Sequence, residues 1–112
     1  MVVKTRTPKV IEARKTILEL ILAHHPQDCL NCIRNGNCEL QDLANEYFIR
    51  DNPFTLKVRG LKKDYSTPSI FRDPDKCVLC RRCIDACSVV QSVHALGLEN
   101  RGVHSMVVPT MG

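Results

Sequence analysis

The chain has 112 residues, of which 44% are hydrophobic and 4% aromatic, with no tryptophan and a formal charge of +4. A chain of this size buries only a modest core, so bound metal clusters would add to its stability. Its basic residues are scattered and its aromatic residues few, which argues against nucleic-acid binding. The longest apolar run covers only residues 20–23, so we expect no membrane span.

Cysteine is over-represented, with seven residues, an odd number. The first residues lead into a charged helix and not into an apolar signal segment. We therefore expect a cytoplasmic protein, in a reducing compartment where thiols bind metals instead of forming disulfides. If all seven thiolates bind oxidised iron-sulfur cores, most of the apparent positive charge disappears.

The first predicted element is a helix over residues 8–24. Thr7 is a suitable N-cap and Pro8 a suitable first residue, and apolar side chains then recur at three- and four-residue spacings until Pro26 ends the helix. Four charged residues of this helix are expected on a solvated face: Glu12, Arg14, Lys15 and Glu19.

A candidate metal site follows directly, with the spacing H-x3-C-x2-C-x5-C. Its four candidate ligands are His25, Cys29, Cys32 and Cys38. Two residues between the first two cysteines allow one turn of backbone to bring both sulfurs to one centre, and Asn35-Gly36 predicts a tight turn that returns the third. Zinc and iron-sulfur clusters both accept three cysteines and one histidine, so this motif alone leaves the metal open.

Two adjacent histidines compete for the ligand position. His25 is favoured because Pro26 fixes the backbone as it turns toward Cys29. His24 is interpreted as a histidine at the helix C-terminus, where a positive charge is favourable. A neutral imidazole in place of a thiolate would raise the potential of the cluster, as it does in Rieske centres.

Beyond this motif, residues 39–48 predict a second short helix and residues 54–69 an irregular connection. Tyr65 and Phe71 either shield a cluster from water or simply anchor this loop.

The second cysteine motif has the spacing C-x2-C-x2-C-x3-C and comprises Cys77, Cys80, Cys83 and Cys87. This is the run found in bacterial ferredoxins, with Ser88 where a proline usually follows. A zinc ribbon would place two C-x2-C pairs a dozen or more residues apart. We therefore predict iron-sulfur clusters at both motifs, and a structural zinc-binding interaction module is the alternative.

The C-terminal part predicts a short helix over residues 83–90 and a hairpin of residues 95–98 and 103–108 around 99–102. His94 and His104 have no ligand spacing and are predicted to be surface or packing residues.

These motifs resemble a known family. H-P-Q-D-C-L-N-C-I-R-N-G-N-C-E-L-Q-D-L, R-D-P-D-K-C-V-L-C-R-R-C-I-D-A-C and A-L-G-L-E-N-R-G are similar to an iron-sulfur region of several redox enzymes. These are the FeFe hydrogenases, the hydrogenase subunit of NAD(P)-linked bifurcating complexes, related formate dehydrogenase subunits and the large iron-sulfur subunit of complex I. The resemblance is strongest to the hydrogenase type. It implies a 4Fe-4S cluster on His25, Cys29, Cys32 and Cys38, and a second motif like the first half of a two-cluster ferredoxin domain.

The resemblance also implies partners. Such proteins usually carry a 2Fe-2S domain before this region, and a second cysteine motif and a catalytic domain after it. We therefore expect a small subunit or an excerpt of a larger oxidoreductase, working with 2Fe-2S, flavin or catalytic components, and we assign no catalytic residue. In two-cluster ferredoxins the fourth cysteine serves the other cluster, so Cys87 either closes its own cluster or belongs to a cluster held elsewhere.

Together these observations predict an α+β electron-transfer module. We expect a helical 4Fe-4S domain over residues 1–50, a connecting segment over 51–72, and a ferredoxin-like 4Fe-4S segment with a β-hairpin over 73–112.

Overall fold

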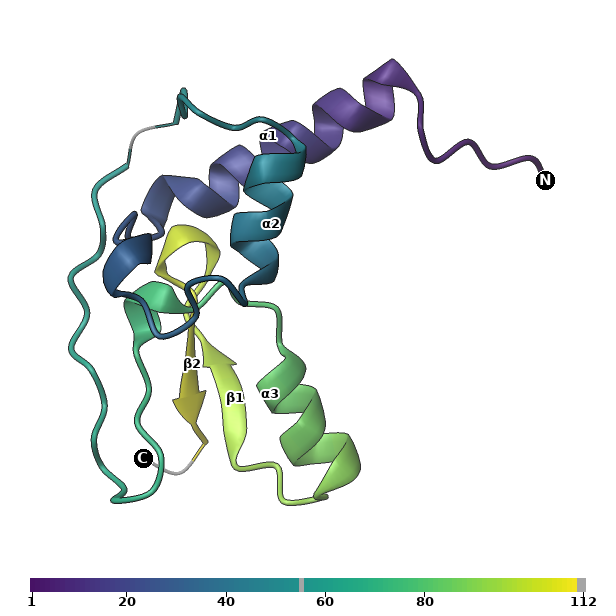
Figure 1. Ribbon diagram of the computed structural model, residues 1–112. Coiled ribbons are helices and arrows are strands. Elements are labelled where there is room, and N and C mark those ends of the chain that lie inside the picture. The colour runs from purple at the N-terminus through teal and green to yellow at the C-terminus, as the bar shows by residue number, and fades with distance from the viewer. Residues whose placement is uncertain (55, 111–112) are drawn as a thin grey trace. The chain divides into compact units, whose positions relative to one another are not determined.

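The computed structural model of the chain describes residues 1–54 and 56–110 (Figure 1). The chain forms two compact units, Met1–Gly60 and Leu61–Gly112. The described residues contain helices and one two-stranded antiparallel sheet, which confirms the expected α+β class. No helix in the described ranges has the length and apolar character needed to cross a bilayer.

The first helix, α1, spans Pro8–His24, as predicted. The Oγ1 of Thr7 accepts a hydrogen bond from the backbone N–H of Val10 at 3.3 Å, and Pro8 occupies the first turn, where its missing N–H is not needed. His25 leaves the helix in an extended conformation, and its N–H donates to the carbonyl of Leu22. Both ends were predictable because start and stop signals act over a few residues.

The core of the first unit is sparse. Leu18 and Ala23 are each 7% exposed, whereas Ile17 is 57% exposed despite its place in the apolar pattern. The prediction of a solvated Glu19 was wrong, since this residue is only 8% exposed. The side-chain amide of Asn52 donates to the backbone carbonyl of Glu19 at 2.8 Å, so the segment after the second helix lies against this part of α1.

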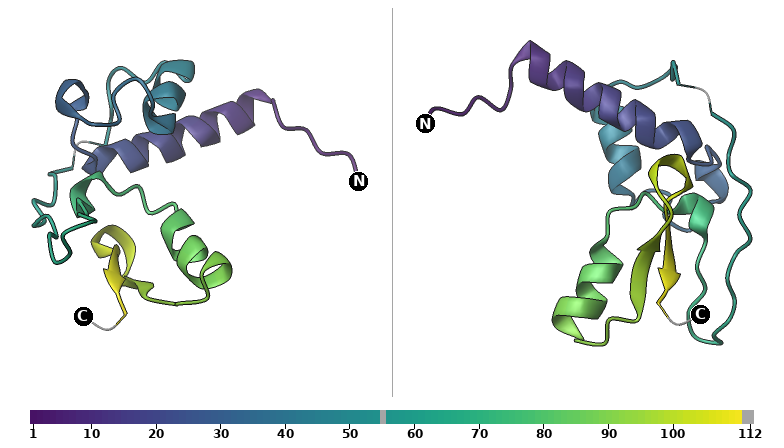
Figure 2. Two further views of the ribbon diagram at one scale, coloured as in Figure 1. Left: turned by 60° about the horizontal axis from the view of Figure 1, so that its bottom comes forward. Right: turned by 180° about the vertical axis from the view of Figure 1, so that it is seen from behind.

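The second helix, α2, spans Glu39–Glu46 and packs against α1 (Figure 2). It ends two residues earlier than predicted because Phe48 takes a left-handed conformation, with φ of 51°. The N–H of Phe48 donates to the carbonyl of Asn45 and the N–H of Ile49 to that of Ala44. This pair of bonds is a Schellman motif, which satisfies the last carbonyls of a helix.

The second unit contains two short helical turns, a helix and a hairpin. Its elements are η2 (Pro74–Lys76), α3 (Arg82–Asp85), η3 (Ala86–Val90), β1 (Leu96–Glu99), η4 (Gly102–His104) and β2 (Met106–Pro109). The helix predicted over residues 83–90 is confirmed, although its second half, η3, is a π-helix.

The predicted hairpin is also confirmed, with Leu96 opposite Pro109 and Glu99 opposite Met106. β2 begins three residues later than predicted because residues 102–104 form a 3₁₀ turn, in which the N–H of His104 donates to the carbonyl of Arg101. α3 packs against β1 beside it (Figure 2).

The described part of the predicted connection over residues 54–69 has no helix or extended strand; residue 55 lies outside the described residues. Tyr65 and Phe71 stack on each other, with ring centroids 5.8 Å apart, and remain 67% and 57% exposed. Of the two interpretations offered for this pair, anchoring of the loop fits this geometry.

Candidate metal centres

The first motif follows α1 as a series of tight turns. Cys29 opens the 3₁₀ turn η1 (Cys29–Asn31), and the N–H of Cys32 donates to the carbonyl of Cys29 at 3.1 Å. The N–H of Asn35 in turn donates to the carbonyl of Cys32 at 3.0 Å. The backbone therefore curls continuously from the first cysteine to the second and beyond, as the two-residue spacing predicted.

The third cysteine is delivered by the predicted Asn35-Gly36 turn. Gly36 has φ of 76°, the left-handed region that glycine enters without strain. Cys38 then serves as the N-cap residue of α2, and its carbonyl accepts the N–H of Asp42. This ligand candidate therefore lies at the junction between the turn and a helix.

Sequence reasoning missed one residue of this site, Gln41. Its Oε1 accepts the N–H of Gly36 and its Nε2 donates to the Oδ1 of Asn35, both at 3.1 Å. A signal was available, because Gln41 occupies the third helical position after the N-cap Cys38, the position from which glutamine reaches back in a capping box.

The two competing histidines have different surroundings. His25 lies on the wall of a cavity of about 300 Å³ that is otherwise mainly apolar, with Leu22, Phe54 and Leu56 among its lining residues. The Nδ1 of His24 is 3.3 Å from the carbonyl of Lys57 and donates to it when it carries the proton. The Nε2 of His24 is enclosed and has no hydrogen-bond partner among the described residues.

The second motif begins after η2, in a loop with two left-handed residues. Leu79 and Arg81 have φ of 55° and 63°, although neither is glycine. Such conformations cost energy for bulky side chains and are concentrated in functional loops. Left-handed residues within a loop direct backbone N–H groups toward one side, an arrangement that binds anions and iron-sulfur clusters.

A cavity of about 620 Å³ lies beside this loop, with Cys77 and Cys83 on its wall. Much of the apolar part of the remaining wall comes from the hairpin, including Leu96, Met106 and Val108, and the wall also contains charged side chains such as Lys62 and Asp73. An apolar enclosure lowers the local dielectric constant and excludes water from a redox centre. The cavity therefore offers two thiol donors and a partly apolar enclosure to a cysteine-bound cluster.

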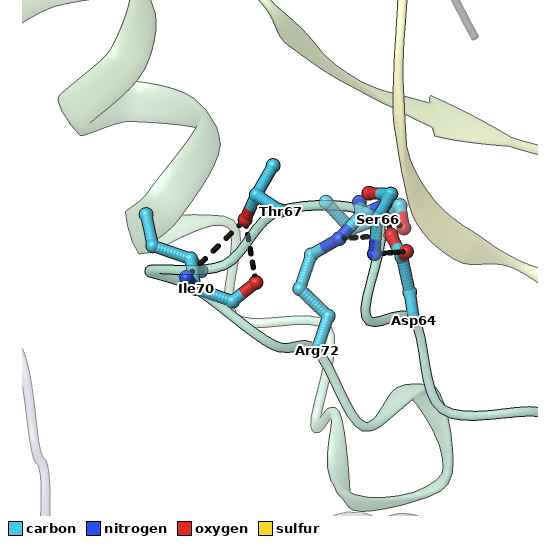
Figure 3. Close-up of polar contacts among 6 residues, drawn as sticks. Asp64, Ser66, Thr67, Ile70 and Arg72 are labelled. Atoms are coloured by element: carbon cyan, nitrogen blue, oxygen red, sulfur yellow. Dashed lines mark hydrogen bonds and ion pairs between the residues drawn. The ribbon is translucent and has the colours of Figure 1, made fainter.

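The cavity is bordered by an ion pair that the sequence did not predict (Figure 3). Asp64 and Arg72 form an isolated antiparallel bridge with two backbone hydrogen bonds of 2.9 Å, and the Nε and Nη2 of Arg72 both donate to the Oδ2 of Asp64. The Nη1 of Arg72 reaches the carbonyl of Val107 in β2 at 3.4 Å. The chain between them turns back at Thr67, whose hydroxyl bonds both the N–H and the carbonyl of Ile70.

This pairing has an electrostatic consequence. Hydrogen bonding from Arg72, followed by that from the backbone N–H of Ser66, lowers the pKa of Asp64 from 3.8 to about 2. Asp64 is therefore ionised at any pH near neutrality, and the loop is closed by a full charge pair.

The other two cysteines of this motif are not on the wall of this cavity. Cys80 is exposed, and Cys87 lies in η3, where its Sγ accepts the N–H of Ala95 at 3.2 Å. Its carbonyl accepts the N–H of Val93. The sulfur of Cys87 is thus directed toward the start of the hairpin.

Within the described residues, no three side chains of histidine, cysteine, aspartate or glutamate converge closely enough to hold a single metal ion. All seven cysteines are free thiols and each is exposed or half-buried. His94 and His104 are exposed, in agreement with their predicted surface role. Seven soft thiolates with an imidazole are the donor set of iron-sulfur clusters, so the residues present fit that group.

Comparison with known protein families places an iron-sulfur match on each motif. Residues 14–53 match the NADH-ubiquinone oxidoreductase-G iron-sulfur binding region, and residues 70–89 match the 4Fe-4S binding domain. The first range contains the histidine and three cysteines of the first motif, and the second contains all four cysteines of the other.

Similar proteins come from two groups of redox enzymes. The chain is 47% identical over 97% of its length to the NADP-reducing hydrogenase subunit HndD of Solidesulfovibrio fructosivorans, and 37% identical over 96% to an NADH-quinone oxidoreductase subunit of Rickettsia prowazekii. It spans only 19% and 16% of those two proteins.

A solved structure, that of an NAD+-reducing NiFe hydrogenase in the H2-reduced state, matches 94% of this chain with a TM-score of 0.86 and 30% identity. The match covers 44% of the hydrogenase chain.

The predicted resemblance is therefore confirmed: the chain carries an NADH-ubiquinone oxidoreductase-G iron-sulfur region followed by a 4Fe-4S binding domain, and is homologous to parts of hydrogenase and NADH-quinone oxidoreductase subunits.

Proposed function

We propose that the chain relays single electrons through two 4Fe-4S clusters within a larger oxidoreductase of the hydrogenase or NAD(P)-linked type. The observation that carries this proposal is the coincidence of each cysteine motif with an iron-sulfur family match. The same coincidence weighs against the zinc alternative. When bound, each cluster supplies the redox chemistry by accepting and returning one electron.

The first cluster is assigned to His25, Cys29, Cys32 and Cys38. The continuous turns of the cysteine loop and the end of α1 before His25 support this set. The chain contributes a histidine presented by a helix, and a loop whose left-handed glycine returns the last thiolate. The domain of this cluster is proposed to cover residues 1–50.

The second cluster is assigned to the segment over residues 73–112, with residues 51–72 as the connection. Its candidate ligands are Cys77, Cys80 and Cys83, with Cys87 as the fourth if that residue closes its own cluster. The cavity with Cys77 and Cys83 on its wall supports the location. The direction of the Cys87 sulfur toward Ala95 favours the alternative in which Cys87 serves a neighbouring cluster, and the iron content decides between the two.

The proposed partners are inferred from the relatives, because this chain spans less than a fifth of the length of those proteins. We propose 2Fe-2S, flavin or catalytic components as electron donor and acceptor, in the cytoplasm. We assign no catalytic residue in this chain.

The test is the metal content of anaerobically purified protein. Iron, acid-labile sulfide and zinc are determined per chain on one sample, and reduced protein is examined by EPR spectroscopy. About eight irons would show that both sites are filled and that Cys87 closes the second cluster, whereas about four would show that only the histidine-containing site is complete. Zinc without iron would refute the electron-transfer proposal.

A further inference from the structure

We propose that Gln41 is a positioning residue of the first cluster, which holds the turn between Cys32 and Cys38 in the shape that presents both thiolates. This inference rests on the proposed ligand set of that cluster. Gln41 is not itself a ligand, and it acts through the backbone that carries the ligands.

The geometry uses both ends of the glutamine amide. Its oxygen accepts the N–H of Gly36 and its nitrogen donates to the side-chain oxygen of Asn35, each at 3.1 Å. One side chain of α2 therefore fixes both residues of the turn. Because Cys38 lies between the turn and the helix as the N-cap of α2, the bridge spans this ligand from one side to the other.

The turn is closed by local backbone hydrogen bonds, from the N–H of Asn35 to the carbonyl of Cys32 and from the N–H of Asn37 to that of Arg34, but it is exposed and gains from a side chain that ties it to α2. Asn35 and Gly36 are exposed, and a Cβ built on Gly36 would meet nothing within 4 Å. Glycine also gives the backbone more freedom than any other residue. A loop that is ordered before it binds its ligand avoids the entropy cost of ordering during binding. Gln41 thus preorganises the ligand loop.

Two substitutions separate this role from general helix stability. Gln41→Leu removes both hydrogen bonds but keeps a strong helix former. Gln41→Glu preserves both hydrogen bonds. One carboxylate oxygen accepts the N–H of Gly36, and the other accepts from the NH2 group of Asn35 after the Asn35 side-chain amide has flipped. Asn45→Leu is the matched control, since Asn45 is exposed on the same helix.

The experiment measures iron release from the full chain, loaded with iron and sulfide under anaerobic conditions, to a ferrous chelator. The EPR signal of each reduced cluster is followed in parallel. We expect Gln41→Leu to lose the first cluster about tenfold faster than the wild type, the order expected for two lost exposed hydrogen bonds. Gln41→Glu and Asn45→Leu should stay within about twofold of the wild type, and the second cluster should be unaffected in all three.

The outcomes distinguish the inference from the function on which it rests. Wild-type protein that holds no iron would refute the proposed function and this inference with it. Loaded wild-type protein with an unchanged Gln41→Leu variant would overturn the positioning role alone. Equal acceleration of both clusters, or failure of Gln41→Glu to retain the wild-type rate, would also overturn it, because either result indicates a general loss of stability.

Discussion

Replacement of His25 by cysteine tests the ligand assignment most directly. The substitution exchanges a neutral imidazole for a thiolate and so adds one negative charge to the cluster. His25 lies at the rigid end of α1, on the wall of a mainly apolar cavity of about 300 Å³. An added charge in such surroundings is poorly screened, so it favours the oxidised cluster.

The size of the effect can be bounded from known centres. Exchange of two cysteines for two histidines in Rieske centres raises the potential by roughly 250 to 700 mV, so a single exchange is worth about 125 to 350 mV. We therefore expect His25→Cys to retain the first cluster and to lower its midpoint potential by about 100 mV or more. An EPR-monitored redox titration of the full chain measures this shift.

The adjacent histidine supplies the matched control. His24→Cys makes the same chemical change one residue earlier, where the imidazole bonds the carbonyl of Lys57. We expect it to leave the midpoint potential unchanged and to destabilise the protein by about 1 kcal/mol through loss of that bond. An unshifted potential in His25→Cys, or a shift in His24→Cys instead, would refute the assignment of His25.

Three further results are expected. Leu18→Ala should lower the free energy of unfolding of the first unit by about 2 to 3 kcal/mol in anaerobic urea, because Leu18 is one of its few buried side chains. Ile17→Ala, at an exposed position, should lower it by less than half as much. Equal decreases for the two variants would contradict the sparse core described above. The folded-state pKa of Asp64, about 2, lies below its ordinary 3.8, so the stabilisation from its pair with Arg72 is complete above about pH 5 and is lost progressively as the pH falls toward 2. Acid unfolding of Arg72→Met should lack this dependence, and a variant that parallels the wild type throughout would exclude the pair as its cause. Cys87→Ser should lower the iron content by about four per chain if Cys87 closes the second cluster, and leave it unchanged if the residue serves another.

Local signals in the sequence predicted much of the first unit. Thr7, Pro8 and Pro26 specify both ends of α1, because capping and proline geometry depend only on neighbouring backbone groups. The end of α2 was predicted less well, since the left-handed conformation of Phe48 is not expected for an aromatic residue. The burial of Glu19 could not be predicted either, because it depends on where the segment with Asn52 lies.

The candidate sites also contain some features that local sequence signals predicted and others that they did not. The spacing of the cysteines indicated iron-sulfur chemistry because a cluster needs several soft donors within reach of one short loop. The bridge from Gln41 was partly within reach of sequence reasoning, since glutamine at the third helical position can reach back toward the residues before the helix, although the N-cap here is cysteine and the bonds go to Asn35 and Gly36. Which histidine and which fourth cysteine act as ligands stays a prediction.

The sequence by itself determined the spacing of the candidate ligands, the turns between them and the α+β order of elements, since each depends on residues at most a few positions apart. Only the tertiary structure decided which side chains enclose the second motif: the hairpin wall beside Cys77 and Cys83, and the Asp64–Arg72 pair at its border. These contacts join residues that are far apart along the chain, and they form because the loop over residues 64–72 folds back on itself and reaches Val107 in β2. No local pattern specifies that path, which depends on the packing of the whole unit.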